Sequence, residues 1–201
     1  MPSVAIQAFI EKHIDLIDKL DFESLYNLAN IDEHVDCSAL TELFMTIDIA
    51  PQLYMKRLPD NFIRDYDGVK SFVIPPNIEE IGTYAFAWCD QLQTVIFTTG
   101  ELNEIKDRAF MYTNIESVIL PDSVCEIGPQ CFAYCGNLTY FELGKGISTL
   151  HGRILQGCLK LKEVHYRGTK EDWNLYVEAH DRWLSNTNVT KIKCSDGDIE
   201  L

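Results

Sequence analysis

The apolar residues of 69–166 follow a pattern that recurs about every 23 residues. Four units align when an aromatic or leucine position is used as the reference, with spacings of 24, 22 and 23 residues, and a partial unit starts at Val69. A single unit of this length cannot bury its own apolar face, so consecutive units must stack and share one core. Three of the recurring columns are Ile81, Ile105, Ile127 and Leu150; Phe86, Phe110, Phe132 and Leu155; and Cys89, Thr113, Cys135 and Cys158.

Within each unit, the end of the pattern predicts a β-strand. The segments "LQTVIF", "IESVIL", "LTYFEL" and "LKEVHY" are rich in β-formers and carry apolar residues at their first, fourth and sixth positions. The preceding segment, "IEEIGTYAFAWC" in the first full unit, brings Ile81, Ala85, Phe86 and Cys89 to one side, as one or two helical turns would. The pattern therefore predicts an α/β coil with a parallel sheet on one face and short helical turns on the other.

Two of these units carry a resemblance to a known family. "IPPNIEEIGTYAFAWCDQLQTVIF" and "LPDSVCEIGPQCFAYCGNLTYFEL" resemble the BspA-type leucine-rich repeat over residues 69–166. The resemblance implies a right-handed βα leucine-rich-repeat solenoid and a closing segment, from His165 to the last residue, in which a tryptophan and a final strand seal the last coil. Thr113 in the cysteine column and Ile154-Leu155 in place of Ala-Phe depart from the family pattern.

Residues 1–65 lack the repeat and show a helical period instead. Apolar residues recur at spacings of three and four, and helix N-caps are expected at Asp21 and at either Ser38 or Asp36. We therefore expect an N-terminal helical cap subdomain over 1–65, repeats over 66–166 and a C-terminal capping segment over 167–201. The first helix is predicted from Ile6, Phe9, Ile10, Ile14, Ile17 and Leu20.

The charge of the chain limits its partners. The net charge is −14, and residues 1–65 and 66–201 each carry about half of it. This balance argues against direct binding to nucleic acid or to an anionic membrane, because both need basic patches. The absence of a long apolar run and of a basic, apolar leader predicts a cytoplasmic protein whose seven cysteines are reduced.

The candidate chemical groups favour structural roles. The column cysteines lie one coil apart, so four of them cannot reach the same metal ion, and we expect no metal site. Cys131 falls in a column of alanines, where we expect a small packing residue. His151 and Cys158 share a coil, but no acid is placed to orient the histidine, and "GKG" at Gly144 lacks the spacing of a phosphate-binding loop. We therefore expect no enzymatic activity and no cofactor.

The outward positions of the strands form the predicted partner-binding surface. Val73, Ile96 and Ile119 would make an exposed apolar strip, although β-propensity alone also places branched residues there. We expect the surface to bind a protein partner; use of the strip by the N-terminal helices or by a second copy stays open. The alternative is an acidic, phage-type decoy that inhibits a basic nucleic-acid-binding host defence protein. The predicted contact residues are Val73, Thr94, Ile96, Ser117, Ile119, Tyr140, Glu142, Glu163 and His165.

Overall fold

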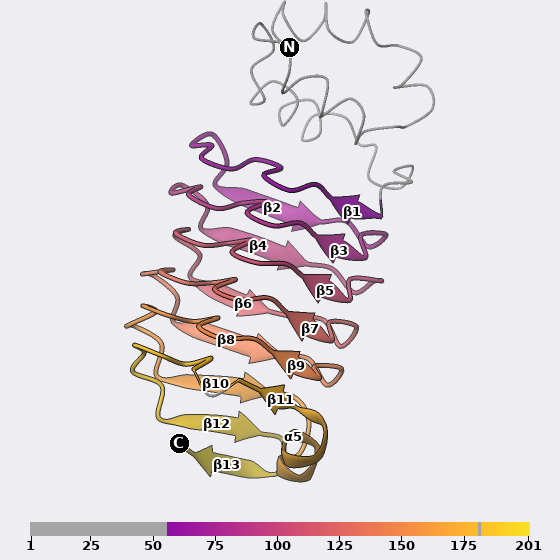
Figure 1. Cartoon of the computed structure of the whole chain (residues 1–201), viewed down its shortest axis with the longest axis vertical. Coiled ribbons are helices and arrows are strands. Elements are labelled where there is room, and N and C mark those ends of the chain that lie inside the picture. Colours follow the sequence, from indigo (N-terminus) through magenta and orange to yellow (C-terminus); the bar gives the residue numbers. More distant parts are fainter. Residues whose placement is uncertain (1–55, 181) are drawn as a thin grey trace, which may run out of the picture. The chain divides into compact units, whose positions relative to one another are not determined.

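A wide β-sheet runs along one face of the repeats (Figure 1). The computed structural model describes residues 56–180 and 182–201, and Arg57–Leu201 form one compact unit. The strand order of the wide sheet is β13-β12-β10-β8-β6-β4-β2, and every neighbouring pair is parallel except β12 and β13. The strands are β2 (Ser71–Ile74), β4 (Thr94–Phe97), β6 (Ser117–Ile119), β8 (Tyr140–Leu143), β10 (Glu163–Tyr166), β12 (Lys191–Cys194) and β13 (Gly197–Glu200).

A second, narrow sheet of two-residue strands runs beside the first. Its order is β1-β3-β5-β7-β9-β11, all parallel, so the chain alternates between the sheets along the repeats. The structure is therefore a parallel β-solenoid, as the repeat predicts. The narrow strands are β1 (Arg57–Leu58), β3 (Glu80–Ile81), β5 (Glu104–Ile105), β7 (Glu126–Ile127), β9 (Thr149–Leu150) and β11 (Glu178–Ala179).

The predicted columns form the core between the two sheets. Side chains of the isoleucine, phenylalanine and cysteine columns are at most 1% exposed, Thr113 included. Phe86, Phe110 and Phe132 stack in parallel, with ring centroids 4.9 and 5.1 Å apart. Each coil thus buries its apolar face against the neighbouring coils as well as between its own two strands.

The helical turns predicted between Ile81 and Cys89 are not formed. Tyr84 and Trp88 have φ of 58° and 61°, in the left-handed region that a right-handed helix excludes. Alternate backbone N–H groups of this segment, those of Tyr84, Phe86 and Trp88, donate to the next coil, for example Phe86 to the carbonyl of Ala109 at 2.7 Å. A helix would direct the same groups to its own carbonyls and leave the next coil without donors.

The C-terminal end of the solenoid is covered by aromatic side chains. Helix α5 (Lys170–Tyr176) begins at a capping box formed by Thr169 and carries the buried Trp173. This ring packs on Tyr166 and Trp183, with centroids 5.3 and 5.8 Å away. The apolar edge of the last coil is thereby removed from water.

Of the N-terminal helical cap predicted over 1–65, residues 1–55 lie outside the described residues. The solenoid begins within that predicted span, at β1, whose Arg57 and Leu58 pair with Glu80 and Ile81. In the described part of the chain, no helix is long and apolar enough to cross a membrane. The domain boundaries expected after residues 65 and 166 stay predictions.

Candidate functional site

The outer face of the wide sheet carries the predicted contact residues in two rows. Strand pairing aligns Ser71, Thr94, Ser117 and Tyr140 in the first row, which continues to Glu163. Because side chains alternate along a strand, the residues two positions further on form a second row on the same face. This second row is Val73, Ile96, Ile119, Glu142 and His165.

The first three strands give this face an apolar row. Val73, Ile96 and Ile119 are 51%, 51% and 53% exposed, whereas the residues that directly precede them on the same strands are at most 6% exposed. Their neighbours in the first row are the small, exposed Ser71, Thr94 and Ser117. The apolar row therefore stands clear of taller side chains and is accessible to a partner.

The following strands give the same face a polar half. The Tyr140 hydroxyl donates to the Glu142 carboxylate, and its ring lies 4.5 Å from that of His165. The hydrogen bond to Glu142, together with partial burial, raises the pKa of Tyr140 to about 12. Arg167 contacts the other oxygen of Glu142 at 3.3 Å, so the tyrosine, the carboxylate and the guanidinium form one network.

Two lysines on this face were missed from the sequence. Strand β12 pairs with β10 and extends the rows to Lys191 and Lys193. The Lys193 ammonium lies 2.8 Å from Glu163 and lowers the pKa of that carboxyl. The alternation in "KIKC", with Ile192 buried, was the signal that could have found them, but this segment lies outside the 23-residue repeat.

The cysteine column forms no chemical site. The thiols of Cys89, Cys135 and Cys158 are buried and donate to carbonyls of the preceding coil, at 2.9 to 3.2 Å. Burial raises the pKa of Cys89 to about 11, which keeps it in the unreactive thiol form at neutral pH. Within the described residues, no group of histidine, cysteine and acidic side chains is arranged to hold a metal ion.

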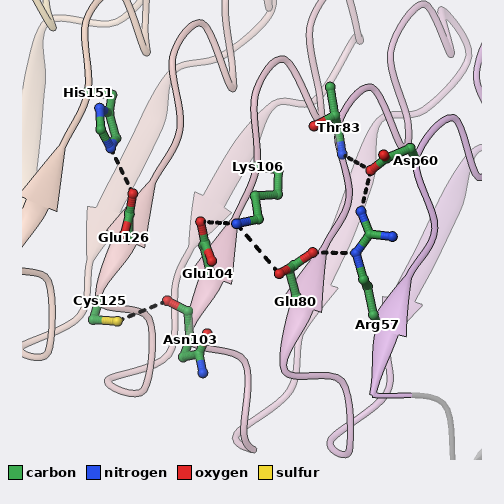
Figure 2. Close-up of polar contacts among 10 residues, drawn as sticks. All are labelled: Arg57, Asp60, Glu80, Thr83, Asn103, Glu104, Lys106, Cys125, Glu126 and His151. Carbon is green, nitrogen blue, oxygen red and sulfur yellow. Dashed lines mark hydrogen bonds and ion pairs between the residues drawn. The ribbon is translucent and has the colours of Figure 1, made fainter.

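The outer face of the narrow sheet carries paired charges (Figure 2). Glu80 contacts Arg57 and, at 3.6 Å, Lys106, which also binds Glu104. On the same face, His151 contacts Glu126 at 2.8 Å. The structure therefore gives His151 a carboxylate partner, while the Cys158 thiol bonds the Phe132 carbonyl in the core.

The repeat is matched by a family model. The model for the BspA type leucine rich repeat region finds six copies over residues 56–177, more than half of the chain. The chain belongs to the BspA-type leucine-rich repeat family. The match is longer than the 69–166 predicted, because it includes the coil of β1 at one end and runs through α5 at the other.

Solved structures of bacterial leucine-rich repeat proteins share the fold. The T. pallidum leucine rich repeat protein is 22% identical, with a TM-score of 0.53, over 54% of this chain and 51% of that chain. The pneumococcal vaccine antigen PcpA is 24% identical, with a TM-score of 0.52, over 67% of this chain and 37% of that chain. A leucine-rich repeat protein from Eubacterium ventriosum is 19% identical, with a TM-score of 0.52, over 62% of this chain and 32% of that chain. The chain thus matches about half or less of the length of these proteins, and no curated protein matches it.

The BspA-type repeat assigns a place to each recurring residue of this chain. Its isoleucine lies on the narrow sheet, its phenylalanine in the central stack and its cysteine beneath the turn. Thr113, where the cysteine is replaced, bonds the carbonyl of Phe110 in its own coil at 3.0 Å instead. The outward residues of the wide sheet vary between coils, from Val73, Ile96 and Ile119 to Glu142 and His165.

Proposed function

We propose that this BspA-type protein is a non-enzymatic interaction module that binds a protein partner through the outer face of the wide sheet. The observation that carries the proposal is the apolar row of Val73, Ile96 and Ile119, each about half exposed on a regular sheet. Exposed apolar patches on repeat solenoids are common contact surfaces, because covering them removes apolar area from water.

The geometry of the face favours binding. The central strands are hydrogen-bonded on both sides, so the backbone that carries their outward side chains is ordered before a partner arrives. Less conformational entropy is lost on association when the surface is already ordered. A rigid row of branched side chains suits a partner that presents a complementary apolar ridge.

The polar half of the face defines the rest of the partner. Tyr140 offers an aromatic surface beside the carboxylate of Glu142 and the ring of His165. Tyrosine is enriched among residues that dominate binding energy. We therefore expect a partner whose apolar ridge is flanked by hydrogen-bonding groups placed over Tyr140.

The non-enzymatic part of the proposal has its own support. The one histidine–cysteine combination considered from the sequence is separated, since His151 contacts Glu126 and Cys158 bonds a core carbonyl. A nucleophile needs a base within hydrogen-bond reach.

The cytoplasmic location is part of the same proposal. All six cysteines of the described residues are free thiols. Free, buried thiols are typical of proteins kept in a reducing compartment.

The acidic decoy is the second candidate, and the paired charges weigh against it. On the narrow sheet, the carboxylates of Glu80 and Glu104 are matched by Arg57 and Lys106. On the wide sheet, Glu163 is matched by Lys193. A surface that imitates nucleic acid would present unpaired negative charge to a basic partner.

The double variant I96D/I119D tests the proposal. Half-burial of two isoleucines contributes about 2 kcal/mol, and the new carboxylates would also lose water, so we expect binding to weaken at least about 30-fold. Immobilised wild-type and variant chains would be compared for partners captured from extracts of the source organism, and the affinity of each captured protein would then be measured.

The matched control is L159D/L175D. Leu159 and Leu175 are 53% and 64% exposed and lie off the wide sheet, so the change in charge and apolarity is the same. Capture that survives in the control and is lost in I96D/I119D, with both folded by circular dichroism, supports the proposal. Equal capture by both variants contradicts it.

A complex that dissociates steeply with salt and is displaced by nucleic acid would favour the decoy.

A further inference from the structure

A shallow pocket of about 370 Å³ lies away from the wide sheet, at the turns that follow the narrow strands. We propose that it binds an oxyanion group through two guanidiniums. This site is independent of the protein-binding face proposed above. The pocket is lined by Pro129, Gln130, Gly152, Arg153, His180 and Arg182.

Three consecutive coils contribute to the pocket. Gln130 follows β7, Arg153 follows β9 and Arg182 follows β11. The backbone N–H of Gln130 donates to the carbonyl of Gly152 at 3.2 Å, and that of Arg153 donates to the carbonyl of Arg182 at 2.9 Å. Stacking of the coils therefore holds the two arginines on neighbouring turns.

The guanidiniums of Arg153 and Arg182 have no acidic partner among the described residues. Other arginines of the chain do have partners: Arg57 contacts Glu80, Arg167 contacts Glu142, and Arg64 stacks on a tyrosine and a tryptophan. Both pocket arginines are exposed, and the pocket-lining residues that the structure describes include no aspartate or glutamate. Both arginines line the same pocket, and an anion bound there would reduce the repulsion between their like charges.

The remaining polar lining also favours an anion. The side-chain oxygen of Gln130 accepts a hydrogen bond from Arg108 at 2.8 Å, so the donors that its side chain can offer are its amide N–H groups. Their only described partner is the side-chain oxygen of Gln156, at a long 3.5 Å. The pocket therefore offers guanidinium and amide donors together.

The ligand chemistry follows from the donors. Planar guanidinium groups fit the paired oxygens of phosphate and carboxylate. The net charge of −14 opposes a long polyanion, so the site suits one anionic group. Phosphate carries more negative charge than a carboxylate near neutral pH, and we expect it to bind more tightly between two cations.

Calorimetric titration of the full chain at low ionic strength tests the site, with inorganic phosphate in one arm and acetate in the other. We expect wild type to bind phosphate and the variant R153Q/R182Q to bind it at least about tenfold more weakly, since each guanidinium provides charge-assisted hydrogen bonds. Glutamine is compatible with the backbone at 153, because Gln130 holds the equivalent position with φ of 56°, close to the 64° of Arg153.

The control variant K70Q/K162Q removes two exposed lysines outside the pocket and changes the net charge equally. Retained phosphate binding in this control, with loss in R153Q/R182Q, assigns the site. Where the double variant does not fold by circular dichroism, R182Q alone serves, with the same expectation. Acetate binding as tight as phosphate, lost in the same variant, identifies a carboxylate as the ligand class. Failure of wild type to bind either ion, or equal binding by wild type and R153Q/R182Q, overturns the proposal.

Discussion

At the scale of single residues, the turns depend on left-handed backbone at two repeating positions. Tyr84, Arg108, Gln130 and Arg153 occupy the first, and each has φ between 54° and 64°. Such a conformation costs a non-glycine residue about 1 kcal/mol or more. The cost is offset because the turn then points its N–H groups at the next coil. The second position is held by Trp88, Tyr112, Tyr134 and Gly157.

Gly157 gives a prediction at this scale. Its φ is 78°, and a Cβ there would lie 2.6 Å from the ring of Tyr134, which is itself stacked on Tyr112. We expect Gly157→Ala to lower the free energy of unfolding by about 1–3 kcal/mol. Urea denaturation followed by circular dichroism measures this.

Gly136→Ala is the control for that substitution. Gly136 has no positive φ, and a Cβ there would meet nothing within 4 Å. We expect no loss of stability. Equal loss in the two variants would show that strain at Gly157 is not the cause.

At the scale of elements, the phenylalanine stack joins the coils. Phe110 lies nearly parallel to Phe86 and Phe132, at interplanar angles of 7° and 3°, and all three are fully buried. Strands of two residues form few hydrogen bonds, so this packing supplies a large part of the contact between coils.

Phe110→Ala should therefore be costly. The substitution removes the middle ring of the stack and leaves a cavity, and we expect the free energy of unfolding to fall by about 3–5 kcal/mol. Phe110→Leu should cost less, because Leu155 already fills the equivalent position in a later coil. Denaturant midpoints of the two variants, with the exposed Gln93→Ala as control, measure the difference. A loss in Phe110→Ala no larger than in Gln93→Ala would contradict this account of the stack.

At the scale of the whole solenoid, we expect the C-terminal end to be the part most sensitive to acid. The pKa of Glu163 is lowered by Lys193, that of Asp172 by the backbone of Thr169, and that of Asp198 by Lys191. All three carboxylates lie in the last coils, where the repeat ends and β12 and β13 close the sheet.

The sign of the acid effect follows from these directions. A carboxylate with a lowered folded pKa stabilises the protein above its unfolded pKa, about 4, and this contribution is lost as pH falls through the folded pKa. We expect stability to decline below about pH 4 and protection of amide hydrogens to fail first in β12 and β13.

Hydrogen exchange at several pH values measures the order of loss. The variant E163Q removes one of the linked groups, so its stability should depend less steeply on pH below about 4 than that of wild type. An acid response that begins in β2 or β4 instead would contradict the assignment to the C-terminal end.

The amino-acid sequence alone determined the coil and its core. Since each unit repeats the same apolar columns, equivalent residues must stack, and the spacing by itself places Phe86, Phe110 and Phe132 in one column. The alternation within the strands likewise placed Val73, Ile96 and Ile119 on the outer face. These features depend on the local pattern and on burial by the adjacent coil, both of which can be read from the repeat.

Only the tertiary structure decided the turns, the narrow sheet and the groups outside the repeat. The segment around Tyr84 has a helical spacing of apolar residues, yet it forms turns because its N–H groups must reach the carbonyls of the next coil. Lys193 joins the wide sheet, and Arg182 comes beside Arg153, through chain segments that lack the 23-residue spacing. These neighbours are determined by how the last coil packs against the coil before it. This packing is long-range, so a local sequence pattern does not predict it.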